Sequence, residues 1–118
     1  MERQVFEALQ GTLSADDAVR RSSEQLLKQL ELDTGFSLAA ANVALADEAG
    51  LAVRQAAMVQ IRGYVNRHWS IGSVKYEAGP IPDQQAKAQV REKVFSLLTD
   101  ANRKLRTVSA AVVANMAL

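Results

Sequence analysis

Three similar stretches of the 118-residue sequence decide its fold: Ser14-Ala-Asp-Asp-Ala-Val-Arg20, Glu48-Ala-Gly-Leu-Ala-Val-Arg54 and Asp100-Ala-Asn-Arg-Lys-Leu-Arg106. Each stretch runs from a polar break in the chain to an aliphatic residue that is followed directly by an arginine. The aliphatic positions, Val19, Val53 and Leu105, are separated by 34 and 52 residues, and a long loop at about 70–81 accounts for the difference. The sequence therefore predicts one unit, a pair of helices, that is repeated three times.

Between the glycines and prolines the apolar residues recur at helical spacing, which predicts six helices. These helices are expected at about 2–11, 15–31, 35–48, 51–68, 82–98 and from 101 or 102 to the end of the chain. Ser14 is expected to cap the second helix, with Asp16 and Asp17 in its first turn, where the helix dipole favours acidic side chains. Pro82 and Asp83 are expected to start the fifth helix.

The predicted core consists of the apolar residues that share one face of each helix. They are Val5, Phe6, Leu9, Val19, Leu26, Leu27, Leu30, Phe36, Ala39, Ala40, Val43, Ala46, Val53, Ala57, Ile61, Tyr64, Val90, Val94, Leu97, Leu105, Val108 and Val112. Tyr64 and Trp69 are assigned to the core rather than to a binding site, because they continue the apolar helical spacing.

The predicted fold is all-α, a right-handed superhelix of about six helices in three antiparallel pairs, at roughly 1–32, 33–69 and 82–118. The repeated residues Arg20, Arg54 and Arg106 are expected to support the stack by reaching an acid or a carbonyl of an adjacent turn or repeat; the alternative is an exposed arginine on an ordinary amphipathic helix. The apolar end, Ser109–Leu118, has no polar cap, so we expect the N-terminal piece of a longer solenoid. The alternative is a small complete domain whose last helix packs centrally.

Composition excludes several classes of function. Lys plus Arg is 14 and Asp plus Glu is 13, so the net charge of +1 predicts no direct nucleic-acid binding. A local patch of basic residues is the alternative that this count leaves open. No Cys and one His exclude thiolate metal sites, a His-based zinc site and a credible catalytic triad. The sequence has no Gly-rich phosphate loop and no stretch that approaches a membrane span. We therefore expect no enzyme activity, cofactor, metal or membrane partner.

One helix carries a resemblance to a known family. The stretch from Ala52 to Trp69 reads Ala-Val-Arg-Gln-Ala-Ala-Met-Val-Gln-Ile-Arg-Gly-Tyr-Val-Asn-Arg-His-Trp, which resembles the second HEAT repeat of the importin-β (karyopherin-β) family. Leu13–Leu30 resembles the first repeat of that family, and the segment from Lys104 resembles the third. The loop from Ser73 to Pro80 is most similar to the histone-carrying importin-nine branch. In one departure, Arg62-Gly63 stands where the family has Lys–Asn, so no amide contact is expected from position 63.

The resemblance implies a nuclear import receptor built as a HEAT solenoid. Such receptors bind the GTP form of the small GTPase Ran through their N-terminal repeats, carry protein cargo and contact Phe-Gly nucleoporins. Core histones are the implied cargo, held mainly by repeats beyond this chain, and the receptor shuttles between cytoplasm and nucleus. The alternative is a HEAT scaffold for protein assembly in which bound nucleotide does not control release.

The resemblance also implies candidate residues for binding Ran. These are Arg62, Asn66 and His68 on the fourth helix, where Arg62 and Asn66 are surface neighbours because they lie four residues apart. Arg103, Lys104 and Arg106 form a basic cluster that is a further candidate for partner contact. For both groups the alternative is a solvated helix surface.

Overall fold

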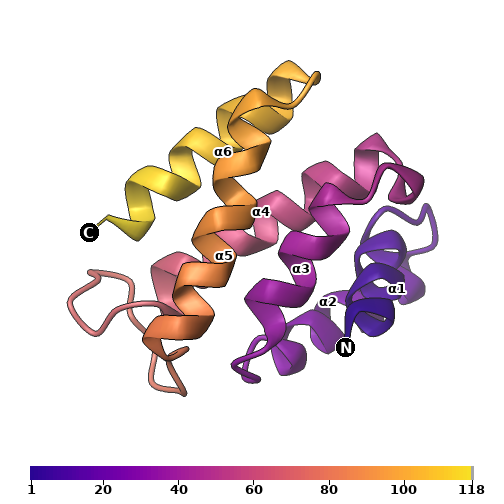
Figure 1. Ribbon diagram of the computed structural model, residues 1–118. Coiled ribbons are helices and arrows are strands. Elements are labelled where there is room, and N and C mark those ends of the chain that lie inside the picture. The colour runs from indigo at the N-terminus through magenta and orange to yellow at the C-terminus, as the bar shows by residue number, and fades with distance from the viewer. Residues whose placement is uncertain (118) are drawn as a thin grey trace.

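The computed structural model describes residues 1–117, which form helices joined by turns and contain no strand (Figure 1). The α-helices are α1 (Glu2–Thr12), α2 (Asp17–Leu30), α3 (Phe36–Leu45), α4 (Leu51–His68), α5 (Gln84–Ser96) and α6 (Arg103–Met116). Short 3-10 turns, η1 (Asp47–Ala49) and η2 (Leu97–Thr99), follow α3 and α5. The predicted all-α class is confirmed. Leu118, expected to end the sixth helix, lies outside the described residues.

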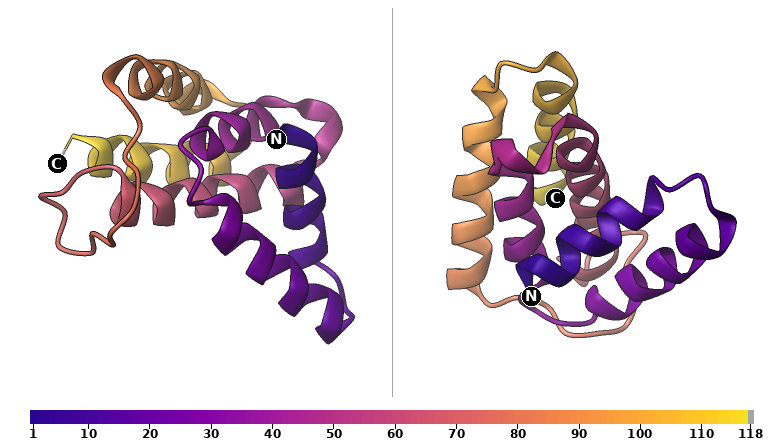
Figure 2. Two further views of the ribbon diagram at one scale, coloured as in Figure 1. Left: turned by 90° about the horizontal axis from the view of Figure 1, so that it is seen from below. Right: turned by 90° about the vertical axis from the view of Figure 1, so that its right-hand side faces the viewer.

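Consecutive helices pack as pairs, and the pairs stack side by side. Helices α3 and α5 form one layer, while α4 and α6 form a second layer beneath them (Figure 2). The α1–α2 pair stands at a steep angle to these layers, and α1 contacts both α3 and α4. Helix α4 lies at the centre of the stack, and α6 lies at one edge. The last described helix is therefore not the central one, in contrast to the alternative of a domain whose last helix packs centrally.

Polar side chains define where three of the helices begin. The Asp16 carboxylate accepts the backbone N–H of Ala18 at 2.9 Å and therefore caps α2. The expectation that Ser14 caps this helix is wrong, because its hydroxyl accepts the N–H of Asp16 and so orders the turn before the cap. A carboxylate at this position satisfies a free N–H group and also suits the helix dipole. Asp83 and Asn102 cap α5 and α6 in the same way.

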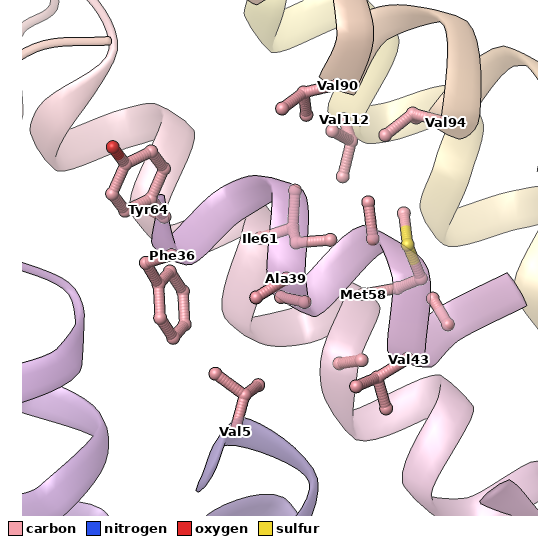
Figure 3. Close-up of a cluster of buried hydrophobic side chains, with 14 of the residues drawn as sticks. Val5, Phe36, Ala39, Val43, Met58, Ile61, Tyr64, Val90, Val94 and Val112 are labelled. Atoms are coloured by element: carbon pink, nitrogen blue, oxygen red, sulfur yellow. The ribbon is translucent and has the colours of Figure 1, made fainter. Parts of the chain in front are cut away.

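The core is continuous from the first helix pair to the third (Figure 3). Val5 of α1 reaches the Phe36 ring, which lies 5.5 Å from the Tyr64 ring between their centroids. Ile61, three residues before Tyr64 on α4, lies toward the third pair (Figure 3). Tyr64 and Trp69 are both buried, as predicted. Burial raises the pKa of the Tyr64 hydroxyl to about 12, above its ordinary value.

Two residues of the predicted core lie at the surface instead. Val19 is 42% exposed and Leu26 is 37% exposed, although both were expected to face inward. The reason is that α2 packs mainly against α1, so only a narrow stripe of α2 around Leu27 is covered. The sequence predicts an apolar face, but the number of neighbours that cover this face is a tertiary property.

The three repeated arginines all bond to polar groups in turns or at helix ends. Arg20 donates to the carbonyl oxygen of Ser14 at 3.2 Å, and Arg106 donates to that of Asp100 at 2.8 Å; each acceptor lies six residues earlier in the chain. Arg54 reaches further, to the Ala44 carbonyl oxygen at 2.7 Å and to the Asp100 carboxylate at 2.7 Å. The predicted structural role is confirmed, and the link between repeats is made by Arg54.

We expect the substitution Arg54→Met to lower the free energy of unfolding by about 2 to 3 kcal/mol, because it removes charge-assisted hydrogen bonds from a partly buried site. The guanidinium side chain is 11% exposed and the Asp100 side chain 17% exposed. Urea unfolding followed by circular dichroism measures the change. Arg62→Met, at an exposed position of the same helix, is the control and should stay within about 0.5 kcal/mol of wild type. Equal losses in the two variants would contradict this role for Arg54.

The same site predicts a pH dependence of stability. The backbone N–H of Asn102 and then the Arg54 guanidinium lower the pKa of the Asp100 carboxyl below its ordinary value. Because the pKa is lower in the folded state, the carboxylate stabilises the fold above its unfolded-state pKa of about 3.9 and loses this contribution as the pH falls further. Asp100→Asn should therefore be less stable than wild type near neutrality, and the difference should shrink in acid. If Asp100→Asn and wild type differ in unfolding free energy by the same amount at about pH 7 and at about pH 3, this pH dependence is contradicted.

Candidate functional site

A groove between α4 and α6 brings together the two groups of residues that the sequence singled out separately. It has a volume of about 430 Å³ and is lined by Arg62 of α4 and by Arg103, Lys104, Thr107, Val108 and Ala111 of α6. The α6 residues recur three and four positions apart, so they share the side of the helix that faces α4. Arg62 is 41 positions away from Arg103 in the sequence and meets it through the packing of α4 against α6.

The groove carries a concentrated positive charge. Arg62, Arg103 and Lys104 are exposed, and none of them forms an ion pair with another residue in the range 1–117. No acidic side chain lines the groove. Since the whole chain has a net charge of only +1, this charge is local. The groove therefore offers guanidinium and ammonium donors to the carboxylates or carbonyls of a partner.

Asn66 lies one turn further along α4, next to this groove. It is half-buried and lines an adjoining hollow of about 410 Å³ with the loop that follows α4 and with Asn115 of α6. Its backbone carbonyl accepts the Ser73 hydroxyl at 2.7 Å, which holds the loop against the helix. Arg62 and Asn66 thus lie on the same side of α4, along its border with α6, as their spacing predicts. The same hollow contains Lys75, a further exposed cation.

His68 does not belong to this surface, which corrects the expectation that it joins Arg62 and Asn66. It is 4% exposed, its Nε2 lies 3.9 Å from a carboxylate oxygen of Glu31, and its ring centroid lies 5.5 Å from that of Tyr64. A step of two residues turns the side chain by about 200° around a helix, so His68 faces away from Asn66. Its part in the structure is that of a buried side chain next to the first helix pair.

Arg106 is also separate from the groove. Its guanidinium donates to the carbonyl oxygens of Asp100 and Ala101, at 2.8 and 3.0 Å, and it is half-buried. The predicted basic cluster therefore divides: Arg103 and Lys104 face the groove, and Arg106 holds the turn that precedes α6.

The uncharged residues along the border between α4 and α6 were not predicted from the sequence. Thr107, Ala111 and Asn115 follow Arg103 at intervals of four, a signal that is visible in the sequence. What the sequence does not reveal is which face of α6 meets α4. Within residues 1–117 the structure contains no group of three or more side chains suited to hold a metal ion, and none of the helices there is long and apolar enough to cross a membrane.

Comparison with known proteins gives consistent matches. The family model described as importin-beta N-terminal domain matches residues 23–100. Importin-9 of Drosophila melanogaster is 31% identical over 119 residues, and importin subunit beta-5 of Schizosaccharomyces pombe is 28% identical over 120 residues. These matches cover 99% and 98% of this chain, and the chain spans 12% of the length of each relative. Exportin-2 of Danio rerio is 31% identical over 106 residues, covering 90% of this chain and 11% of that protein.

A solved structure shares the fold. One chain of a structure that describes the binding of Kap95p to RanGDP matches with a TM-score of 0.82 and 21% identity, over 99% of this chain and 14% of that chain. The predicted stack of helix pairs is therefore the fold of a karyopherin segment. The importin-9 match also agrees with the branch indicated by the loop from Ser73 to Pro80. Since the family model covers 78 of the 118 residues, the chain belongs to the importin-beta family and corresponds to its N-terminal domain.

Proposed function

We propose that this chain is the N-terminal segment of a nuclear import receptor and that its α4–α6 groove binds the GTP form of Ran. The observation that carries the proposal is the meeting of Arg62, Arg103 and Lys104 in one groove without an acidic neighbour. Unpaired guanidinium and ammonium groups at a surface attract an acidic partner and fix its orientation. Asn66, next to this groove, supplies amide hydrogen bonds.

The fold neighbour supports the choice of partner. Kap95p, whose structure this chain resembles, binds Ran so that the switch loops of RanGDP adopt the GTP-bound conformation. A protein that favours this conformation of the switch loops discriminates between the two nucleotide states through its differential affinity for them. We infer the same preference for this chain.

The proposal extends to the whole receptor. Protein cargo, including basic cargo such as core histones, would be held mainly by repeats outside this segment, because 13 acids against 14 bases do not give it an acidic surface. Release of cargo by Ran-GTP requires the two ligands to compete or to prefer different curvatures of the solenoid. Contacts with Phe-Gly nucleoporins and shuttling between cytoplasm and nucleus belong to the same proposal, as does the absence of enzymatic activity.

Charge reversal in the groove tests the Ran contact. Binding of the chain to Ran loaded with a non-hydrolysable GTP analogue or with GDP is measured by titration calorimetry. We expect tighter binding to the GTP form, and we expect Arg62→Glu with Lys104→Glu to weaken it by about tenfold or more. The matched control, Arg3→Glu with Lys93→Glu, places the same charge change on α1 and α5 and should alter the affinity by less than about twofold.

Two results would contradict the proposal in different ways. Equal weakening by the groove variant and its control would show that the groove is not the contact surface. Equal affinity for both nucleotide states, or no binding to either, would favour the scaffold alternative.

His68 and Arg62 should behave differently when each is replaced by alanine. His68→Ala leaves a cavity in a buried site, so we expect a loss of about 2 kcal/mol in unfolding free energy and little change in Ran affinity at a temperature where the chain is folded. Arg62→Ala should keep the stability and weaken Ran binding. Thermal melts and calorimetry on the two variants measure both properties. If His68→Ala keeps its melting temperature and loses Ran affinity, the residue binds Ran directly and the structural assignment is wrong.

A further inference from the structure

A second and larger groove separates the first helix pair from the second. It has a volume of about 780 Å³ and lies between α2, which contributes Leu27 and Lys28, and α4, which contributes Val59 and Arg67. Helices α2 and α4 do not pack along each other, since the first pair is attached mainly through α1. Two apolar residues of the groove walls, Leu32 and Val59, stay 54% and 58% exposed. The α1–α2 pair thus stands apart from the layers, as Figure 2 shows.

One ion pair closes this gap. Nη2 of Arg67 lies 2.6 Å from a carboxylate oxygen of Glu31, the residue directly after α2. The Glu31 side chain is 6% exposed, and its other oxygen lies 3.9 Å from Nε2 of His68. In the part of the chain that the structure describes, no other side-chain hydrogen bond joins α2 or Glu31 to α4. A buried carboxylate is strongly destabilised when its partner is removed, so loss of this contact has a large energetic cost.

The sequence provides the space that this ion pair requires. Gly63 lies beneath the Arg67 side chain, and a Cβ atom built at position 63 would lie 2.8 Å from Nη1 and 3.0 Å from Nη2 of that arginine. A glycine inside a helix is unfavourable for the helix itself. Its benefit here is that the guanidinium can pass close to the helix at position 63 and reach Glu31. The departure from the family pattern at position 63 thus has a structural reason.

We propose that the Glu31–Arg67 pair is a latch that fixes the angle between the α1–α2 pair and the rest of the chain. With the latch made, α2 is held at one defined separation from α4. With the latch broken, the first pair is attached through the apolar contacts of α1 and the hydrogen bond that the Asn42 side chain of α3 donates to Glu2, and it can turn about them, so that the groove widens or closes over Leu32 and Val59. The latch goes beyond the proposed function, because it concerns the geometry of the helix pairs whichever partner binds.

Spin-label distances test the latch directly, because the chain has no native cysteine. Cysteines at the exposed positions Gln25 and Ala114 report on α2 against α6, and cysteines at Ala52 and Ala114 report on the second and third pairs alone. In Arg67→Met we expect the distribution of the first distance to broaden by about twofold or more, while the second distribution stays as in wild type.

Gly63→Ala is the second variant, since it keeps both charges and makes the guanidinium shift. It should broaden the distance between positions 25 and 114 less than Arg67→Met does, because the end of the arginine side chain can move. Arg62→Met, which removes a neighbouring exposed charge, is the control and should leave both distributions unchanged. The latch is wrong if Arg67→Met and Gly63→Ala both keep the wild-type distribution between positions 25 and 114. It is also wrong if either variant broadens the distance between positions 52 and 114 equally, because the pair would then support the whole fold.

Discussion

The structure depends on the burial of α4. This helix of 18 residues, about 27 Å long, packs against α3 and α6 and is also touched by α1. Its buried residues, from Val53 to His68, span about 140° around the helix, a stripe wide enough to face more than one neighbour. Each fully buried aliphatic side chain contributes about 1.5 to 3 kcal/mol, so α4 is where the helix pairs gain most of their mutual attachment. Figure 3 shows this helix between α1 and the third pair.

The central position of α4 also decides how its polar side chains are used. Arg54 points to the turn of the third pair, Arg62 to the groove beside α6, and Arg67 across the gap to Glu31. The step of five positions from Arg62 to Arg67 corresponds to about 140° around the helix, which places the two guanidinium groups on different sides. One rigid helix therefore connects the proposed binding surface to the proposed latch. A partner seated on Arg62 is held by the same element whose far side sets the position of the first pair.

The prediction of the fold succeeded where the signal is local. Helix α4 occupies the predicted range 51–68, and Asp83 and Asn102 begin their helices as expected, because caps and apolar spacing involve residues a few positions apart. It failed at Val19, where an apolar residue has the spacing of a core position and no neighbour to cover it. It failed at His68 for the opposite reason: a polar residue near a helix end is buried because Glu31, 37 positions earlier, packs beside it.

What the sequence determined by itself is the set of helices, their pairing by the repeated arginines, the near absence of net charge and the membership of a helical-repeat family. These properties follow from hydrogen bonding and apolar periodicity within one or two turns of chain. Only the tertiary structure decided that Arg62 shares a groove with Arg103 and Lys104, that Arg106 turns away from it, and that Gly63 makes room for the bond between Arg67 and Glu31. The physical reason is that such contacts depend on the angle and separation at which two helices pack, and these are set by the fit of whole side-chain surfaces rather than by any short stretch of residues.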